Sequence, residues 1–403
     1  MTAHFNFISG KLRYAWELVS DSGNNHVTNQ GRIIPKFFLS PSFSGGVPLA
    51  FLEYTTASVS SFQLGQFSGS RCDVDWGDGT TDTNVGVNLK THTYSSAGVY
   101  TIKITPVEGF LFQPQHYGAA DYQTNLTKVD GTGGSSLSAD LTKWLRETTS
   151  LTSFGSSIDT SNVTNFQATW RQCTGLTSFP AINTSSGTNF QSAWEGCTGF
   201  TSFPLINTSS ATNIRNAWLN CTALTSFPAI DTSSVTQPRD AWNGCANLTS
   251  FPVLDMSSGT DFRGSWLGCT SLTSFPSITP TSGTDFGGAW FNCTSLADYP
   301  ANQFDNTGTL TSAAFNTTFS NCALTSQSIE NILTSLDTNG AQNITLSLNG
   351  GTNANASTWS YDSLEAYIDL INKGWTVTQN GTPGIGYTIN NSGTSFTLRS
   401  AGT

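Results

Sequence analysis

Residues 174–197 read TGLTSFPAINTSSGTNFQSAWEGC, and this stretch recurs in tandem along the chain with a 24-residue period. Tryptophan keeps this period at Trp170, Trp194, Trp218, Trp242, Trp266 and Trp290. Cysteine keeps the same step at Cys173, Cys197, Cys221, Cys245, Cys269 and Cys293. A looser seventh copy places Phe319 and Cys322 further along, after a longer step. An internal period of this regularity predicts an array of stacked structural repeats.

Each unit of this array predicts one short strand and one short helix. The apolar residues of one unit fall at i, i+3, i+4 and i+7, namely Phe190, Ala193, Trp194 and Cys197. This spacing is typical of a helix with one apolar face, and Thr188 stands where an N-cap would be. The stretch 176–180 predicts a strand that its proline ends. A single unit is too small to fold alone, so stacking is expected to stabilise the array.

The repeated pattern CTxLTSFPxI…TSxVTxF…WxxC resembles the BspA-type leucine-rich repeats of bacterial surface proteins and phage structural proteins. The resemblance covers residues 151–322, and it implies a leucine-rich-repeat-like β/α solenoid of seven coils. This chain departs from the family by placing tryptophan where phenylalanine or methionine is common. The fold class expected for the whole chain is mainly β with short helices.

The tryptophans and cysteines are expected to form an inward structural ladder. Each cysteine shares the apolar face with a tryptophan and has neither a CxxC partner nor a nearby histidine, which favours buried thiols. Disulfide or metal roles are the alternative, because neighbouring strands lie about 4.8 Å apart. Exposed tryptophans that stack on sugars are the alternative to an inward ladder.

Upstream of the array, residues 74–80 read VDWGDGT and residues 92–104 read HTYSSAGVYTIKI. This pair resembles the PKD domain, an immunoglobulin-like β-sandwich, and the resemblance covers residues 50–106. It implies a spacer module in which Asp75, Asp78 and Asp82 mostly set turns, with a calcium site as the alternative. Cys72 is expected to lie in a strand. Apolar stretches within residues 1–49 predict further short strands, at 5–8, 12–18 and 33–39. This region is expected to anchor the chain to a larger particle.

Residues 107–150 are expected to connect the module to the array and to cap its first coil. Downstream, apolar spacing predicts helices around 329–336 and 364–371 and strands at 344–348 and 375–378. Gly374 is placed to stop the second helix. Residues 323–380 resemble the α/β C-terminal cap of BspA-type arrays in phage proteins, and a cap is needed because the last coil would expose its core. Residues 381–403 form a Gly/Ser/Thr-rich tail.

One outward position of the array carries charge. It reads Gln167, Gln191, Arg215, Arg239, Arg263 and Gly287. Stacking would bring Arg215, Arg239 and Arg263 into one row on a chain with only 16 basic residues. The row is either a solvated face or a ligand-binding strip for acidic glycans, phosphates or a partner's carboxylates.

The composition and the charge of the chain exclude several classes of partner and function. The 403 residues carry a net charge of −10, and only 10% of them are charged, so nucleic acid and anionic membranes are not expected partners. No apolar run is long enough to span a membrane, and the first twenty residues lack the pattern of a signal peptide. The four histidines are His4, His26, His92 and His116, and none lies in a catalytic or metal-binding motif.

These observations predict a non-enzymatic bacteriophage virion protein without cofactors, catalytic residues or a resident metal. A tail fibre or similar surface fibre that mediates host attachment is expected, on the virion surface. A capsid decoration or head fibre protein is one alternative, and a BspA-type adhesin of the bacterial surface is another. A glycan-active enzyme is disfavoured. Expected partners are other virion proteins, reached through the N-terminal region, a host glycan or protein receptor, and further copies of the chain.

Overall fold

The structure is a computed structural model, and the residues that it describes are 2–8, 11–17, 51–67, 71–86, 89–107, 114–115, 120–132 and 137–383. The chain divides into two compact units, Met1–Gly46 and Val47–Thr403. In the first unit, β1 (Thr2–Ile8) pairs antiparallel with β2 (Lys11–Glu17). The strands expected at 5–8 and 12–18 lie in this hairpin as far as residue 17, whereas residue 18, the strand expected at 33–39 and most of the 381–403 tail lie outside the described residues.

The second unit begins with a region of small β-sheets. Its elements are β3 (Phe51–Thr56), β4 (Val59–Leu64), β5 (Gln66–Phe67), β6 (Cys72–Asp75), β7 (Thr81–Val85), β8 (Lys90–Gly98), β9 (Thr101–Pro106), β10 (Pro114–Gln115), α1 (Ala120–Asn125), β11 (Leu126–Thr132) and β12 (Ser153–Phe154). The largest sheet has the order β12-β11-β3-β9-β6-β7, and β4 pairs with β8 in a separate sheet. Cys72 therefore lies in a strand, as expected.

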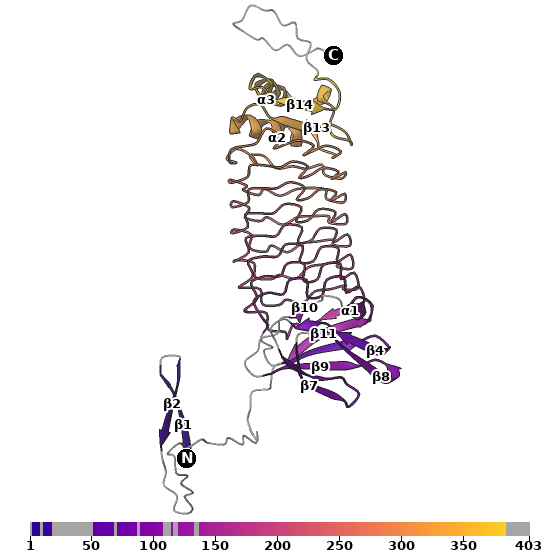
Figure 1. The fold of residues 1–403 in the computed structure, drawn as a ribbon. Helices are drawn as coiled ribbons and strands as arrows, with labels where there is room; N and C mark the ends of the chain where they lie inside the picture. The colour runs from indigo at the N-terminus through magenta and orange to yellow at the C-terminus, as the bar shows by residue number, and fades with distance from the viewer. Residues whose placement is uncertain are drawn as a thin grey trace, which may run out of the picture. The chain divides into compact units, whose positions relative to one another are not determined.

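The sheet region continues directly into the stack of coils (Figure 1). β11 pairs antiparallel with β3 on one side and parallel with β12, at the start of the first coil, on the other. The indole Nε1 of Trp144 donates to the hydroxyl of Tyr54 at 2.9 Å, and both side chains are fully buried. One hydrogen-bonded ladder thus joins the sheet region to the coils.

Each coil of the stack places a pair of tight turns where a helix was expected, so the helix prediction for 190–197 was wrong. Ala193 N–H donates to the carbonyl of Phe190, and Cys197 N–H donates to that of Trp194. The third residue of each turn, Ser192 or Gly196, has a left-handed backbone with φ of 55° or 73°. This is the pattern of type II turns.

The remaining amides of the turns bind the following coil. Phe190, Ser192 and Trp194 each donate a backbone N–H to a carbonyl of the next coil, at 2.8–2.9 Å. Successive helical amides would all bond within the helix, so the paired turns are what free every second amide for stacking. The strand expected at 176–180 was also wrong, because this stretch contains a bend and no strand.

The expected threonine N-cap was also wrong. The hydroxyl of Thr188 donates to the carbonyl of Thr164 in the preceding coil, at 3.2 Å. The first turn is instead supported by Asn189, whose Oδ1 accepts from the backbone N–H of Gln191 at 3.1 Å. The threonine therefore connects coils, while the residue after it stabilises the turn.

Two aromatic ladders fill the core of the stack. The six repeated tryptophans are fully buried and stack with centroids 5.2–5.6 Å apart, and Phe319 continues the ladder 5.2 Å from Trp290. A phenylalanine ladder runs beside them, and its rings meet the tryptophans edge to face at 4.8–5.4 Å. The prediction that the tryptophans point inward is confirmed.

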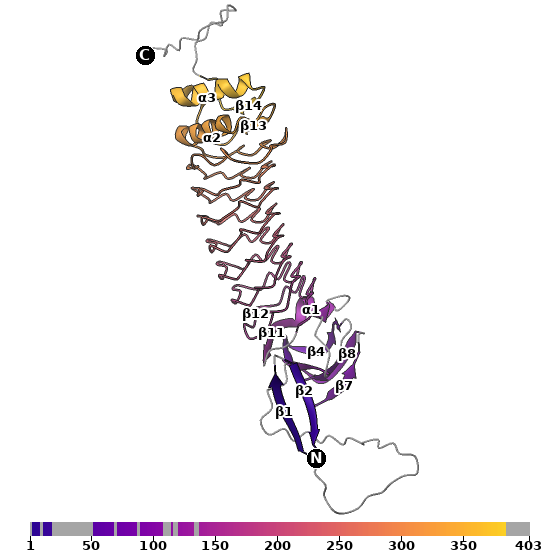
Figure 2. The same cartoon turned by 90° about the vertical axis from the view of Figure 1, so that its left-hand side faces the viewer.

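The C-terminal end of the stack is covered by two helix–strand units (Figures 1 and 2). They comprise α2 (Ser326–Asn339), β13 (Thr345–Leu348), the 3₁₀ turn η1 (Ala356–Thr358), α3 (Tyr361–Asn372) and β14 (Thr376–Gln379). β13 bridges to Phe315 of the last coil and pairs parallel with β14. Gly374 has a φ of 83° and donates its N–H to Ile371, so it ends α3 as predicted.

Candidate binding face of the coil stack

The position that carries the three arginines is the second residue of the first turn in each coil. We call it the outer row, and its members are Gln167, Gln191, Arg215, Arg239, Arg263 and Gly287. The residue that follows each row member donates its N–H to the next member's carbonyl. Ser192 bonds Arg215 at 2.9 Å, Asn216 bonds Arg239 at 3.1 Å, and Asp240 bonds Arg263 at 2.9 Å. The row is therefore in register from coil to coil.

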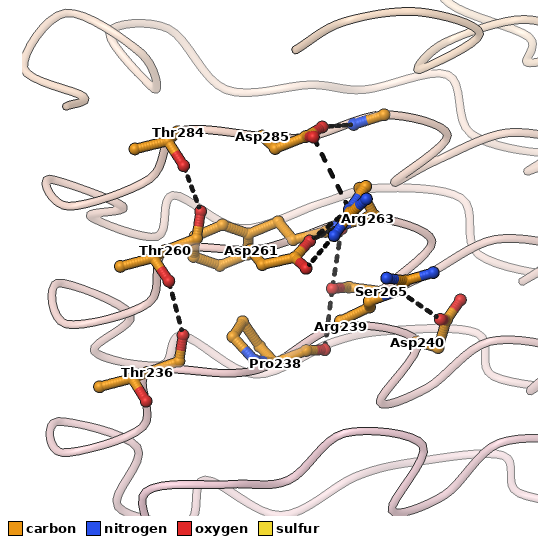
Figure 3. A network of polar contacts seen from close by, with 12 residues as sticks. Thr236, Pro238, Arg239, Asp240, Thr260, Asp261, Arg263, Ser265, Thr284 and Asp285 are labelled. Carbon is orange, nitrogen blue, oxygen red and sulfur yellow. Dashed lines mark hydrogen bonds and ion pairs between the residues drawn. The ribbon is translucent and has the colours of Figure 1, made fainter. Parts of the chain in front are cut away.

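Arg263 is neutralised by its own surroundings (Figure 3). Its Nε and Nη2 donate to the two oxygens of Asp261 at 2.9 and 2.6 Å, and Asp285 lies 3.6 Å from Nε. Burial tends to raise the pKa of Asp261, but the hydrogen bonds from Arg263 outweigh it and hold that pKa below its usual value. The hydrogen bond to Asp261 likewise raises the pKa of Arg263.

Arg239 is also paired, because its Nε donates to Asp240 at 3.2 Å. Arg215 makes no ion pair with a carboxylate of the described residues. Its Nε atom is buried and has no acceptor in that part of the chain. The expected strip thus contains two compensated cations and one uncompensated cation.

A column of hydroxyls runs alongside the row. Figure 3 shows Thr236, Thr260 and Thr284, whose hydroxyls each donate to the threonine carbonyl one coil earlier, at 3.1–3.2 Å. These bonds hold the threonines at the spacing of the coils. The face therefore presents ordered hydroxyl, amide and guanidinium groups on a rigid backbone.

The repeated cysteines are free buried thiols, as expected. Each donates its S–H to a carbonyl of the preceding coil, as Cys221 does to Trp194 at 3.2 Å. Desolvation by burial raises the pKa of Cys245 to about 12 and raises that of Cys221 well above its usual value. Thiols in this state are poor nucleophiles and poor metal ligands.

The turn between β6 and β7 uses its carboxylates internally. Asp78 accepts from Thr80 and lies 2.8 Å from Nε2 of His92, and these hydrogen bonds lower its pKa to about 2. Asp82 accepts from Nε1 of Trp76 at 2.9 Å, and Asp75 accepts from the N–H of Gly77. Among the described residues no group of three or more histidine, cysteine or acidic side chains could hold a metal ion.

His92 stacks on Trp76 at 4.7 Å; the side chains of His4, His26 and His116 lie outside the described part. A cavity of about 580 Å³ lies between residues 307–310 and 339–342, and no acidic or basic side chain lines it. No helix in the described ranges is long and apolar enough to cross a membrane.

The paired carboxylates are the feature of this face that the sequence interpretation missed. Asp261 stands two residues before Arg263, whereas Asn213 stands two residues before Arg215. This difference is visible in the sequence and would have predicted that Arg263 has a carboxylate partner and Arg215 has none two residues before it. Comparison of the chain with protein-family models, with curated proteins and with solved structures found no match.

Proposed function

We propose that this chain is a non-enzymatic structural protein of a bacteriophage particle, a tail fibre or similar surface fibre that attaches to the host cell. The observation that carries the proposal is the in-register stack of 24-residue coils, together with the resemblance of its repeat to BspA-type arrays. In this proposal the stack is a leucine-rich-repeat-like solenoid. Residues 50–106 are a PKD-like spacer, and residues 1–49 attach the chain to the particle.

The physical properties of the stack support a binding role. Coil-to-coil hydrogen bonds and two aromatic ladders fix the outer side chains at regular positions, which lowers the entropy lost on binding. Several copies on one particle would add avidity to weak single contacts. The side chains that could act as nucleophiles or bases already have partners within the protein. The thiols of the stack donate to backbone carbonyls, and His92 pairs with Asp78.

Attachment is tested with the purified full chain and the source phage. Host cells that are preincubated with the chain are expected to adsorb fewer phage particles, and gold-labelled antibody against the chain is expected to mark fibres in electron micrographs. Particles without label would contradict the proposal. Phage encoding a chain that lacks residues 1–49 are expected to lose the label, because those residues are proposed to anchor it.

A further inference from the structure

Arg215 differs from the two other arginines of the outer row in its electrostatic partners. Arg263 binds two carboxylates and Arg239 binds one. The residue two positions before Arg215 is Asn213, whose Oδ1 accepts the Arg215 backbone N–H at 3.0 Å but carries no charge. In the described part of the chain, the positive charge of Arg215 is left uncompensated.

The side chain of Arg215 is also partly desolvated. It is half-buried, and its Nε is covered by protein without an acceptor among the described residues. Because Nε is covered, an anion would bind the terminal nitrogens of the guanidinium, and the partial burial of the side chain strengthens such a charge-assisted contact. An anion at Arg215 would gain charge-assisted bonds without displacing a protein carboxylate, whereas an anion at Arg263 would first have to replace Asp261.

On the side of the preceding coil, Arg215 is flanked by uncharged hydrogen-bonding side chains, whereas on the other side the row continues with Arg239 and its partner Asp240. Gln191 occupies the same row one coil earlier, and its Oε1 accepts from Nδ2 of Asn213 at 3.4 Å. The exposed Thr212 lies one residue before Asn213 in the hydroxyl column. Amides and hydroxyls at fixed spacing are suited to sugar or polyol hydroxyls, and one free cation matches one negative charge.

We propose that Arg215, with Gln191 and Asn213, forms a subsite for a singly charged oxyanion carried on a polyhydroxyl chain. The ligand class is an acidic polymer of the host envelope, bearing either carboxylates or phosphodiesters. The inference rests on the proposed attachment role and names the chemistry of its receptor. Arg239 and Arg263 do not belong to this subsite, because their own carboxylates occupy them.

The test is titration calorimetry of the full chain at low salt with three probes. Oligogalacturonate carries carboxylates, poly(glycerol phosphate) carries phosphodiesters, and methyl-esterified oligogalacturonate is the uncharged analogue. Arg215→Gln is compared with Arg263→Gln, which removes the same charge from the same row. The proposal expects one anionic probe to bind, Arg215→Gln to weaken it about tenfold or more, and Arg263→Gln to change it less than about threefold.

The preferred anionic probe identifies the oxyanion. Equal losses in the two variants would overturn the subsite, because net charge alone would then explain binding. Equal binding of the uncharged ester would also overturn it, as would the absence of binding by both anionic probes at about 1 mM. These failures differ from failure of the attachment role, which the antibody labelling of particles tests without reference to a ligand.

Discussion

The tryptophans inside the coil stack are used differently from Trp144 and Trp375 at its two ends. Each repeated tryptophan stacks on its neighbours, yet its buried indole N–H has no hydrogen-bond acceptor in the described residues. At the ends, Trp144 donates to Tyr54, and Trp375 donates to the carbonyl of Ala341 at 2.8 Å. Within the stack tryptophan serves as a flat apolar surface, whereas Trp144 and Trp375 also connect one element to another.

The largest effect is expected from removing a ring in the middle of the stack. The Trp218 ring stacks on Trp194 at 5.4 Å and on Trp242 at 5.6 Å between centroids, so Trp218→Ala leaves a cavity within the tryptophan ladder. We expect a loss of about 3–5 kcal/mol in the free energy of unfolding. Denaturant titration measures it. A loss below about 1 kcal/mol would show that neighbouring coils can collapse onto the gap.

A smaller change separates the two uses of tryptophan. Trp144→Phe and Trp218→Phe remove similar ring area, but only the former removes a hydrogen bond and leaves the buried Tyr54 hydroxyl without that donor. We expect Trp144→Phe to cost about 1–3 kcal/mol more in unfolding free energy. The same denaturant titrations compare them. Equal costs would mean that the Tyr54 contact adds nothing to the junction.

Acid is expected to weaken the sheet region. The hydrogen bonds from Thr80 and His92 lower the folded pKa of Asp78 to about 2, below its usual value of 3.8. A carboxyl with a depressed folded pKa contributes stability above its unfolded pKa, and that contribution is lost as the pH falls from about 4 to about 2. Stability measured by urea titration should therefore decline more steeply in the wild type than in Asp78→Asn. Parallel pH profiles would contradict this assignment.

The smallest effect is expected at the surface of the stack. Arg263 pairs with Asp261, but 45% of its side chain is exposed, so solvent and salt screen the interaction. Arg263→Gln should change the free energy of unfolding by less than about 1 kcal/mol, and high salt should reduce the difference further. A larger and salt-independent loss would show that this pair stabilises the stack as a buried contact would.

The period of the sequence was sufficient to predict the stack and its inward side chains, but not the conformation of 190–197. Two consecutive four-residue turns bury their first and last residues, which places apolar residues at i, i+3, i+4 and i+7 just as a helix does. The distinguishing signal lies in the outward residues. Glycine and asparagine recur at the left-handed positions, as with Asn216 and Asn220, and such residues favour turns over helices.

The C-terminal elements were predicted more closely because they follow ordinary rules. α2 has Thr325 as N-cap and Gly340 in the left-handed conformation after its last turn. The outer row was also predicted, but its ion pairs were not. Asn213 and Asp261 close the same Asx turn, but only Asp261 brings a carboxylate to the arginine two residues later, so Arg215 lies beside an amide.

The in-register coils make the length of this protein adjustable in whole steps. Because the coil-to-coil hydrogen bonds and the Trp ladder repeat with the period, removing the one repeat that contains Trp218 would place Trp194 against Trp242 in the same surroundings. Each coil adds about 4.8 Å, the spacing of neighbouring strands. Gene duplication or deletion of one repeat would then change the reach of the protein while both ends stay intact, so that the number of coils acts as a molecular ruler.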